Sequence, residues 1–222
     1  MSRQQTSYYP LFVDLTDRRC VVVGGGPIAQ RKVALLLRCG ARVAVISPAL
    51  TARLQAHARA WRIDHRARRF RPTDLEGAWL VFAATDDQAI NEAVSRTARR
   101  LRVFANIVDQ AALCTFIAPA IYMRGPLTVA VSTGGGSPAL AKRLRDEAAR
   151  TAAQGYAPML ALLASLRGRA KRRLNTYQSR KRYFESLVQG RVFTLVRAGQ
   201  LRRARVAALQ LLDRCAARNG TP

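Results

Sequence analysis

The residues with the clearest chemical signature form a glycine-rich turn near the N-terminus. Gly24, Gly26 and Ala29 fit the pattern G-x-G-x-x-[GA], and the run between them contains Pro27 and Ile28. In such a turn the first glycine permits the bend, the second lets the backbone approach a pyrophosphate, and the following helix start attracts the anion. We therefore expect Gly24, Gly26, Pro27 and Ile28 to bind a dinucleotide; the alternative is a glycine-rich turn without a ligand.

Two further short segments are expected to contact the same cofactor. The second apolar run ends in Ser47 and Pro48, where a dinucleotide site usually has Asp or Glu for the ribose diol. The Ser47 hydroxyl can bind a ribose hydroxyl, and it neither requires nor excludes a 2′-phosphate, so these residues leave NAD and NADP open. Thr85 follows a third buried run and can contact the cofactor, cap the next helix, or do both.

A carboxylate and a second glycine-rich loop supply the remaining candidate chemistry. Asp109 ends another apolar run, where it can accept a proton from a substrate that loses a hydride, or simply form a turn. The loop at residues 132–137 opens onto Pro138 and can cradle an anion or cap a helix. The four cysteines are scattered without a CxxC pair, and we take His57 and His65 as surface or structural residues, so we expect no metal site.

An alternation of strands and helices positions these residues. The pattern predicts strands at residues 19–23, 42–46, 63–70, 79–84 and 103–108, with helices at 29–39, 50–61 and 87–100. Such an alternation is typical of a Rossmann-type α/β fold with a doubly wound, mainly parallel sheet.

The rhythm changes after residue 109. We predict strands at 114–118 and 127–131, joined by a turn at 122–126, and then helices with breaks near 155–158 and at 190. The predicted domains are a dinucleotide-binding domain at 1–112, a small β segment at 113–150 and a helical C-terminal domain at 151–222.

The formal net charge of +25 calls for an explanation. A basic chain can bind nucleic acid, a membrane surface or a polyanionic small molecule. The basic side chains comprise 34 Arg and only 4 Lys, which also fits a composition bias, and we weigh the two explanations equally. The N-terminus is polar and no apolar run is long enough to span a bilayer, so we expect a cytoplasmic protein without a membrane partner.

Several motifs together resemble one family, the precorrin-2 dehydrogenases, which also form the N-terminal module of siroheme synthases. The matching runs are YPLF at 9–12, VVGGGPIAQRK at 22–32, VISP at 45–48, AATDD at 83–87, NIVD at 106–109, FIAPA at 116–120 and VAVSTGGGSP at 129–138. They lie in one colinear order over residues 8–150. Generic dinucleotide folds do not share the NIVD and STGGGSP runs.

This resemblance implies a function. It implies NAD-dependent oxidation of precorrin-2 to sirohydrochlorin, for sirohaem or a corrinoid, with Asp109 as the general base. It also implies a homodimer, with the segment at 113–150 contributing to dimerisation, and a polyanionic tetrapyrrole substrate with eight carboxylates. We assign the substrate side of the site to Asn106, Ser132, Thr133, Gly134 and Ser137.

Three further expectations accompany this interpretation. Some members of the family insert iron, but this chain has no histidine after His65, and we expect no chelatase activity. The sequence ends at Pro222, and we expect no methyltransferase module. The alternative function is a dinucleotide-responsive regulatory protein whose basic helical module binds nucleic acid or an acidic partner. The chain has no basic patch interleaved with aromatic residues, which argues against nucleic acid.

Overall fold

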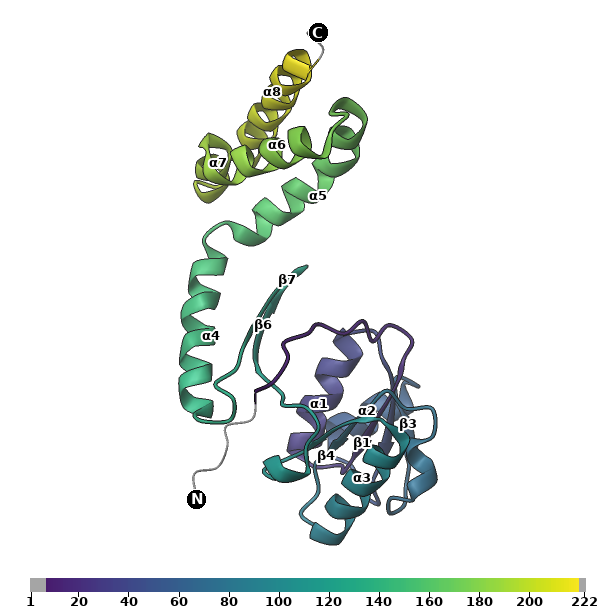
Figure 1. Ribbon diagram of the computed structural model, residues 1–222. Coiled ribbons are helices and arrows are strands. Elements are labelled where there is room, and N and C mark those ends of the chain that lie inside the picture. Colours follow the sequence, from purple (N-terminus) through teal and green to yellow (C-terminus); the bar gives the residue numbers. More distant parts are fainter. Residues whose placement is uncertain (1–6, 220–222) are drawn as a thin grey trace. The chain divides into compact units, whose positions relative to one another are not determined.

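The computed structural model describes residues 7–219 of the chain. The chain folds as two compact units, Met1–Ala118 and Pro119–Pro222. The first is an α/β unit, and the second joins a β-hairpin to a set of helices (Figure 1). The predicted fold class is confirmed; the division into domains at 1–112, 113–150 and 151–222 remains a prediction.

A five-stranded parallel sheet forms the centre of the first unit. Its strands are β1 (Arg19–Val23), β2 (Arg42–Ile46), β3 (Asp64–Arg66), β4 (Leu80–Ala83) and β5 (Phe104–Ile107). Their order is β3-β2-β1-β4-β5, so the direction of winding reverses between β1 and β4. Doubly wound sheets bind their ligands at the carboxyl ends of the strands beside such a reversal.

Helices cover both faces of this sheet (Figure 1). The helices α1 (Pro27–Arg38) and α2 (Ala52–Arg59) pack on one face, and α3 (Gln88–Leu101) packs on the other. Alternate residues of β1 serve the two layers, because Val22 packs with Val33 of α1 while Val21 packs with Val94 of α3. Burial on both faces explains why the central strands are continuous β-branched runs in the sequence.

An ion-pair cluster fixes the edge of the sheet. Asp74, in the 3₁₀ helix η1 (Pro72–Leu75), has no exposed side-chain surface and accepts hydrogen bonds from Arg66 (2.9 Å) and from both terminal nitrogens of Arg68 (2.6 and 2.8 Å). The backbone N–H of Arg71 also donates to it at 2.8 Å. The chain turns here to reach Asp74, which is why β3 ends at Arg66 instead of running over the predicted residues 63–70.

The predicted strand at residues 114–118 is wrong. Thr115 binds β5 at one position only, where its hydroxyl accepts from the Ala105 N–H and its own N–H donates to the Ala105 carbonyl, each at 2.8 Å. Phe116 turns inward and meets the rings of Phe82 and Phe104 edge-on. A side-chain bond and a partly buried ring thus replace the ladder of a strand.

In the hairpin the strand predicted at 127–131 is confirmed, but the first strand lies further along the chain than the sequence predicted. Its strands are β6 (Ala120–Arg124) and β7 (Leu127–Val131), joined by Gly125 and Pro126 alone. Gly125 has φ +56° at the first central position, as a type II′ turn requires. The predicted turn at 122–126 was therefore too long, and its first three residues belong to β6.

Helices make up the rest of the second unit as described to residue 219. They are α4 (Pro138–Ala153), α5 (Tyr156–Arg173), α6 (Tyr177–Gln189), α7 (Arg191–Arg197) and α8 (Leu201–Asn219). The helix α4 contacts both hairpin strands, while α5 to α8 share a core around Tyr183, whose hydroxyl donates to the Ala208 carbonyl at 3.0 Å. The predicted breaks at 155–158 and 190 are confirmed by Gly155 and Gly190, and further breaks occur at 174–176 and 198–200.

The Asp74 cluster predicts a pH-dependent contribution to stability. Burial alone raises the pKa of Asp74, but the hydrogen bonds from Arg68, Arg71 and Arg66 outweigh it and lower the pKa to about 2. Because this value lies below that of the unfolded chain, the stabilisation is present above about pH 4 and is lost as the pH falls towards about 2. We expect Asp74→Asn to lower the free energy of unfolding at pH 7 by about 2 kcal/mol and to flatten this acid dependence.

Urea unfolding between pH 7 and pH 2 measures this effect. The matched control is Asp64→Asn, because Asp64 is exposed and pairs with Arg66 at 3.4 Å, a type of contact that contributes little. Equal losses in the two variants would contradict the assignment.

Candidate active site

The turn after β1 brings the backbone too close to its neighbours for any side chain. Gly24 has φ +117°, and a Cβ there would lie 2.1 Å from the Ala84 carbonyl oxygen. A Cβ on Gly25 would lie 1.9 Å from the Ala49 carbonyl oxygen. Both glycines are therefore required by the fold itself. The G-x-G motif allows any residue at the position of Gly25. Here the Ala49 carbonyl, in the loop after β2, leaves no room for a side chain there.

Gly26 differs from the two glycines before it. It is the N-cap of α1 with φ −81°, and a Cβ built there meets no atom within 4 Å. No side chain caps this helix start, and Pro27 occupies its first turn. An uncapped N-terminus that faces open space has room and partial positive charge for a pyrophosphate. The residues present thus fit a dinucleotide.

Ser47 lies at the end of β2 beside this turn. It is 8% exposed, and its hydroxyl donates to the Ala49 carbonyl at 2.7 Å. The ring Nε2 of His65 lies 3.0 Å from the Ser47 carbonyl oxygen, which supports the structural interpretation of this histidine. With its proton committed to Ala49, the Ser47 hydroxyl can only accept a hydrogen bond from a ligand.

Thr85 follows β4, across the reversal from the glycine turn. Its hydroxyl accepts from the Asp87 N–H at 3.2 Å, and Asp87 caps α3 by accepting from the Ile90 N–H at 3.1 Å. The side-chain amide of Asn91 donates to the Thr85 carbonyl at 3.0 Å. The side-chain oxygen of Asn91, Oδ1, is buried without a hydrogen-bond partner among the described residues. Thr85 therefore takes part in capping, and Asn91 is a supporting residue that the sequence analysis missed.

Asp109 lies in a strained turn directly after β5. The Gln110 N–H donates to the Ile107 carbonyl at 3.3 Å, and of the two central residues only Asp109 has a positive φ, +60°. This is the pattern of a type II turn, whose third residue is usually Gly. Holding an aspartate in this conformation costs about 1–2 kcal/mol. The Asp109 side chain is exposed at the carboxyl edge of the sheet.

The charge of Asp109 acts on the pKa of Lys32, a residue of α1. Its ammonium lies 4.9 Å from the centre of the Phe82 ring. Burial lowers the pKa of Lys32, with a further contribution from Arg31, and the negative charge of Asp109 acts in the opposite direction. The sequence analysis did not select Lys32, because nothing in its local pattern connects it with a turn seventy-seven residues later.

Asn106 and the loop at 132–137 are engaged in local structure. The Asn106 amide donates to the Phe116 carbonyl at 3.1 Å, which holds the segment after Asp109. In the second unit, Thr133 and Ser137 bind each other reciprocally at 3.0 Å, and the Ser137 hydroxyl accepts from the Leu140 N–H as the N-cap of α4. The Ser132 hydroxyl accepts from the Gly134 N–H at 3.1 Å. Substrate binding by these five residues stays a prediction.

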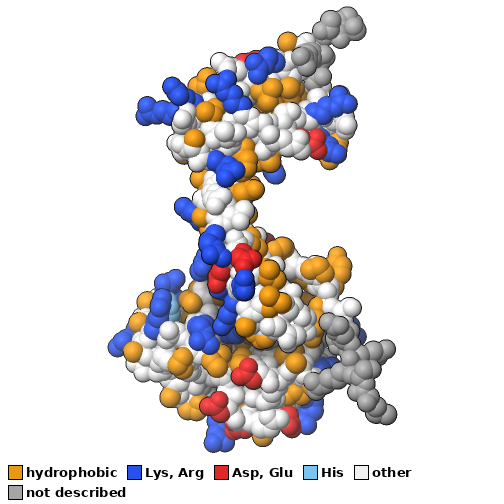
Figure 2. Space-filling model, turned by 90° about the vertical axis from the view of Figure 1, so that its left-hand side faces the viewer, with side chains coloured by type: hydrophobic (Ala, Val, Ile, Leu, Met, Phe, Trp, Pro, Cys, Tyr) orange, Lys and Arg blue, Asp and Glu red, His pale blue; other side chains and the backbone are white. Residues whose placement is uncertain are grey.

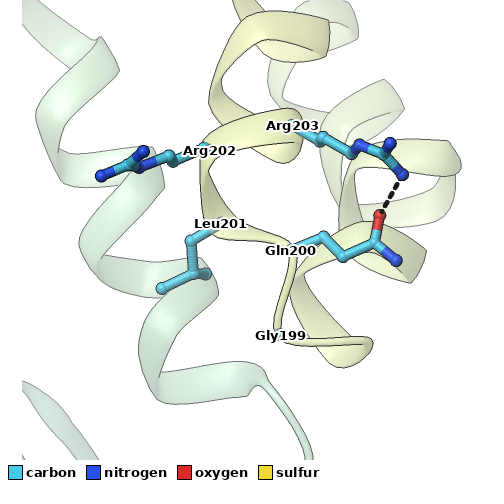
Figure 3. Close-up of a pocket in the computed structure, with 5 residues that line it drawn as sticks. All are labelled: Gly199, Gln200, Leu201, Arg202 and Arg203. Carbon is cyan, nitrogen blue, oxygen red and sulfur yellow. Dashed lines mark hydrogen bonds between the residues drawn. The ribbon is translucent and has the colours of Figure 1, made fainter.

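A surface hollow of about 510 Å³ lies elsewhere, in the helical unit. It is lined by Gly199, Gln200, Leu201, Arg202 and Arg203, and Arg203 donates to Gln200 at 3.2 Å (Figure 3). These side chains offer guanidinium and amide groups but no carboxylate, thiol or imidazole to carry out a reaction. We therefore place the chemistry at the sheet edge.

The basic side chains do not gather into one surface in the view of Figure 2. On the face shown, Lys and Arg are dispersed among hydrophobic and uncharged side chains of the helical unit. Within residues 7–219 there is no group of three or more His, Cys, Asp or Glu that could hold a metal ion. In the same residues no helix is long and apolar enough to cross a membrane.

Comparison with known proteins finds three family models that match successive parts of the chain. Residues 11–120 match the model for a putative NAD(P)-binding domain, residues 124–150 that for the sirohaem biosynthesis protein central region, and residues 155–212 that for the sirohaem synthase dimerisation region. Three successive parts of the chain thus match family models, and two of the three models are named for sirohaem synthesis. The resemblance found in the sequence is thereby confirmed, as is the dinucleotide-binding nature of the first unit.

Individual relatives agree with this assignment. The chain is 45% identical over 204 residues to a siroheme synthase of Methylobacillus flagellatus, and 41% identical over 198 residues to one of Nitrosospira multiformis. These matches cover 92% and 87% of this chain but only 44% and 42% of the relatives, so the chain spans less than half their length. A solved structure, SirC, a precorrin-2 dehydrogenase, shares the fold with a TM-score of 0.76 at 23% identity, over 93% of this chain and all of that one.

Substitutions at Gly26 and at Gly24 are expected to cause two different defects. Gly26→Ala should leave the unfolding midpoint unchanged but weaken NAD binding by about tenfold or more, because the new methyl group takes the space of a pyrophosphate oxygen. Gly24→Ala should lower the free energy of unfolding by more than about 2 kcal/mol through the clash with Ala84. Thermal unfolding and fluorescence titration with NADH measure the two effects. If Gly26→Ala bound NADH like the unchanged chain, the pyrophosphate would not lie at Gly26.

Proposed function

We propose that the chain oxidises precorrin-2 to sirohydrochlorin, with NAD as the hydride acceptor and Asp109 as the general base. The observation that carries this proposal is the position of Asp109, an exposed carboxylate in a strained turn on the same sheet edge as the glycine turn. Strain of this kind persists where the surrounding structure imposes it, and it clusters at active sites. The names of the relatives, siroheme synthase and precorrin-2 dehydrogenase, support the same reaction.

The cofactor side of the proposed site is formed by three segments. Gly24, Gly26, Pro27 and Ile28 hold the pyrophosphate, Ser47 and Pro48 lie towards the adenosine ribose, and Thr85 lies towards the nicotinamide half. NAD, when bound, supplies the nicotinamide ring that accepts the hydride.

Ser47 favours NAD over NADP. Because its proton is held by the Ala49 carbonyl, it can only accept, and a ribose 2′-hydroxyl can donate to it. A 2′-phosphate dianion has no proton to donate and would place its charge against the Ser47 lone pairs.

Asp109 is proposed to take the proton that leaves the substrate together with the hydride. The reaction removes one hydride and one proton, so a base beside the acceptor ring balances it. The charge of Asp109 in turn raises the pKa of Lys32, against the lowering caused by burial.

The substrate is proposed to be held through its carboxylates. Asn106, Ser132, Thr133, Gly134 and Ser137 are the assigned contacts, and a chain with a net charge of +25 attracts an octacarboxylate over long range. The alternative, a regulatory protein that binds nucleic acid, is disfavoured because the sequence has no basic patch interleaved with aromatic residues. Metal insertion is not part of the proposed function, and we place the enzyme in the cytoplasm.

The chain is further proposed to act as a homodimer. The hairpin of β6 and β7 has no buried residue, and a two-stranded sheet alone is marginal in water. On α4, which packs against the hairpin, Leu140 and Leu144 are 48% and 43% exposed. These apolar groups support a dimer contact within residues 113–150, while the family model described as a dimerisation region covers residues 155–212.

Replacement of Asp109 tests the proposed reaction. We expect Asp109→Asn to lower the rate of NADH formation from precorrin-2 by about 10²–10⁴-fold, since the amide cannot accept the proton. The asparagine tolerates the left-handed backbone, so the fold should be kept. Absorbance at 340 nm under anaerobic conditions measures the rate. Asp17→Asn is the matched control, because Asp17 has φ +57° in a turn before β1, at the opposite sheet edge, and this variant should turn over normally.

Two charged substitutions locate the dimer contact. If the contact lies in residues 113–150, Leu144→Glu should convert the dimer to a monomer by burying a charge, whereas Val206→Glu on α8 should not. Both side chains are partly exposed, at 43% and 55%, so neither change should unfold its unit. Light scattering gives the mass of each variant. A dimer lost only in Val206→Glu would move the contact to the helices α5 to α8.

A further inference from the structure

The Asp109 turn has little to hold it in its strained conformation by itself. Its one backbone bond within the turn, from the Gln110 N–H to the Ile107 carbonyl, is long at 3.3 Å. The left-handed backbone of Asp109 is unfavourable for any residue with a Cβ. From outside the turn, the Ala83 carbonyl accepts a hydrogen bond of 3.0 Å from the Val108 N–H. Another group must therefore oppose relaxation of the turn.

The thiol of Cys114 spans the two ends of this turn. Its sulfur accepts from the Ile107 N–H at 3.2 Å, and it lies in donating position to the Ile107 carbonyl at 3.3 Å and the Gln110 carbonyl at 3.4 Å. Burial raises the pKa of this thiol, so at neutral pH it keeps the proton that these carbonyls share. The Cys114 side chain thus binds the first and the last residue of the turn, Ile107 and Gln110.

Cys114 is itself fixed on both sides. Before it, the carbonyl of Leu113, the last residue of the 3₁₀ helix η2 (Ala111–Leu113), accepts a hydrogen bond of 2.7 Å from Ser95 of α3. After it, the Thr115 N–H donates to the Ala105 carbonyl of β5 at 2.8 Å. The sulfur is therefore held against both a helix and a strand, and it can impose its position on the turn.

We propose that Cys114 is a positioning residue for Asp109, whose thiol holds the turn from Ile107 to Gln110 in the left-handed form that presents the carboxylate at the site. The role in catalysis rests on the proposed function, but the restraint of the turn does not. Removal of the sulfur leaves the Ile107 N–H without this acceptor and frees the turn to relax, which displaces Asp109. The cofactor turn at Gly24 shares no hydrogen bond with Cys114 and should be unaffected.

The restraint is tested by stability, without any assay of turnover. Asp109→Gly relieves the backbone strain, and in the chain that keeps Cys114 it should raise the unfolding midpoint by about 2–4 °C. In the Cys114→Ala background the turn has already relaxed, so the same change should raise the midpoint by less than half as much. Equal gains in both backgrounds would show that the thiol does not hold the strained form and would overturn the proposal.

The consequence for catalysis is tested by separating kcat from KM. We expect Cys114→Ala to lower kcat for NADH formation by about tenfold, equal to about 1.4 kcal/mol, while KM for NAD stays unchanged. Cys114→Ser, which keeps a donor and acceptor at the same place, should recover part of the loss. The matched control is Cys39→Ala, a partly buried cysteine at the far end of α1, and it should retain the full kcat.

The possible failures are distinguishable. If the unchanged chain forms no NADH with precorrin-2, the proposed function fails, and the stability measurements still decide whether Cys114 restrains the turn. If Cys114→Ala turns over as fast as Cys39→Ala, the positioning role is wrong even where the reaction is right.

Discussion

The close approach of two backbone segments to the turn after β1 is the constraint on which the site depends. At Gly24 and Gly25 a side chain would overlap the carbonyls of Ala84 and Ala49, which belong to the loops after β4 and β2. Three loops are thereby packed together at one edge, and the start of α1 is left facing open space at Gly26. The cofactor site follows from this packing, because the helix N-terminus can approach a pyrophosphate only where no side chain intervenes.

The rest of the edge shows a division between rigid support and exposed chemistry. The strand β4 is buried on both faces after its first residue, and β5 buries Ala105 and Ile107. Thr85 and Asp109 follow these strands directly, on short turns. Local strain at Asp109 is tolerated because the Cys114 sulfur and the Ala83 carbonyl of β4 accept hydrogen bonds from the backbone N–H groups of Ile107 and Val108. Stability is supplied elsewhere, by the sheet core and by ion pairs such as those of Asp74, which lie away from the turn.

The parts of the fold that local pattern determines could be predicted from the sequence. The bounds of β1 and β2 match the prediction because buried parallel strands are continuous apolar runs, and the glycine turn was recognised from its spacing. The second strand of the hairpin was predicted with its observed bounds. Its first strand was placed wrongly because residues 114–118 have strand composition, while the bond of Thr115 to Ala105 and the packing of Phe116 depend on residues distant in the chain. Lys32 was missed for the same reason, since the Asp109 turn lies far along the chain. Asn91 and Cys114 are only a few residues from their partners, but their roles depend on side-chain directions that the sequence pattern does not show.

The excess of arginine over lysine has a structural explanation beyond composition alone. Arg19 donates to the Asp74 and Glu76 carbonyls, Arg42 to that of Asp17, and Arg180 to that of Leu174, so guanidinium groups satisfy carbonyls where chain segments end. A planar group with five donors can bind two such acceptors at once, which an ammonium does less well. Each arginine used in this way adds to the net charge without facing a ligand. The charge of +25 is therefore in part a by-product of how the loops are closed, and the evidence for function lies in the few groups at the sheet edge.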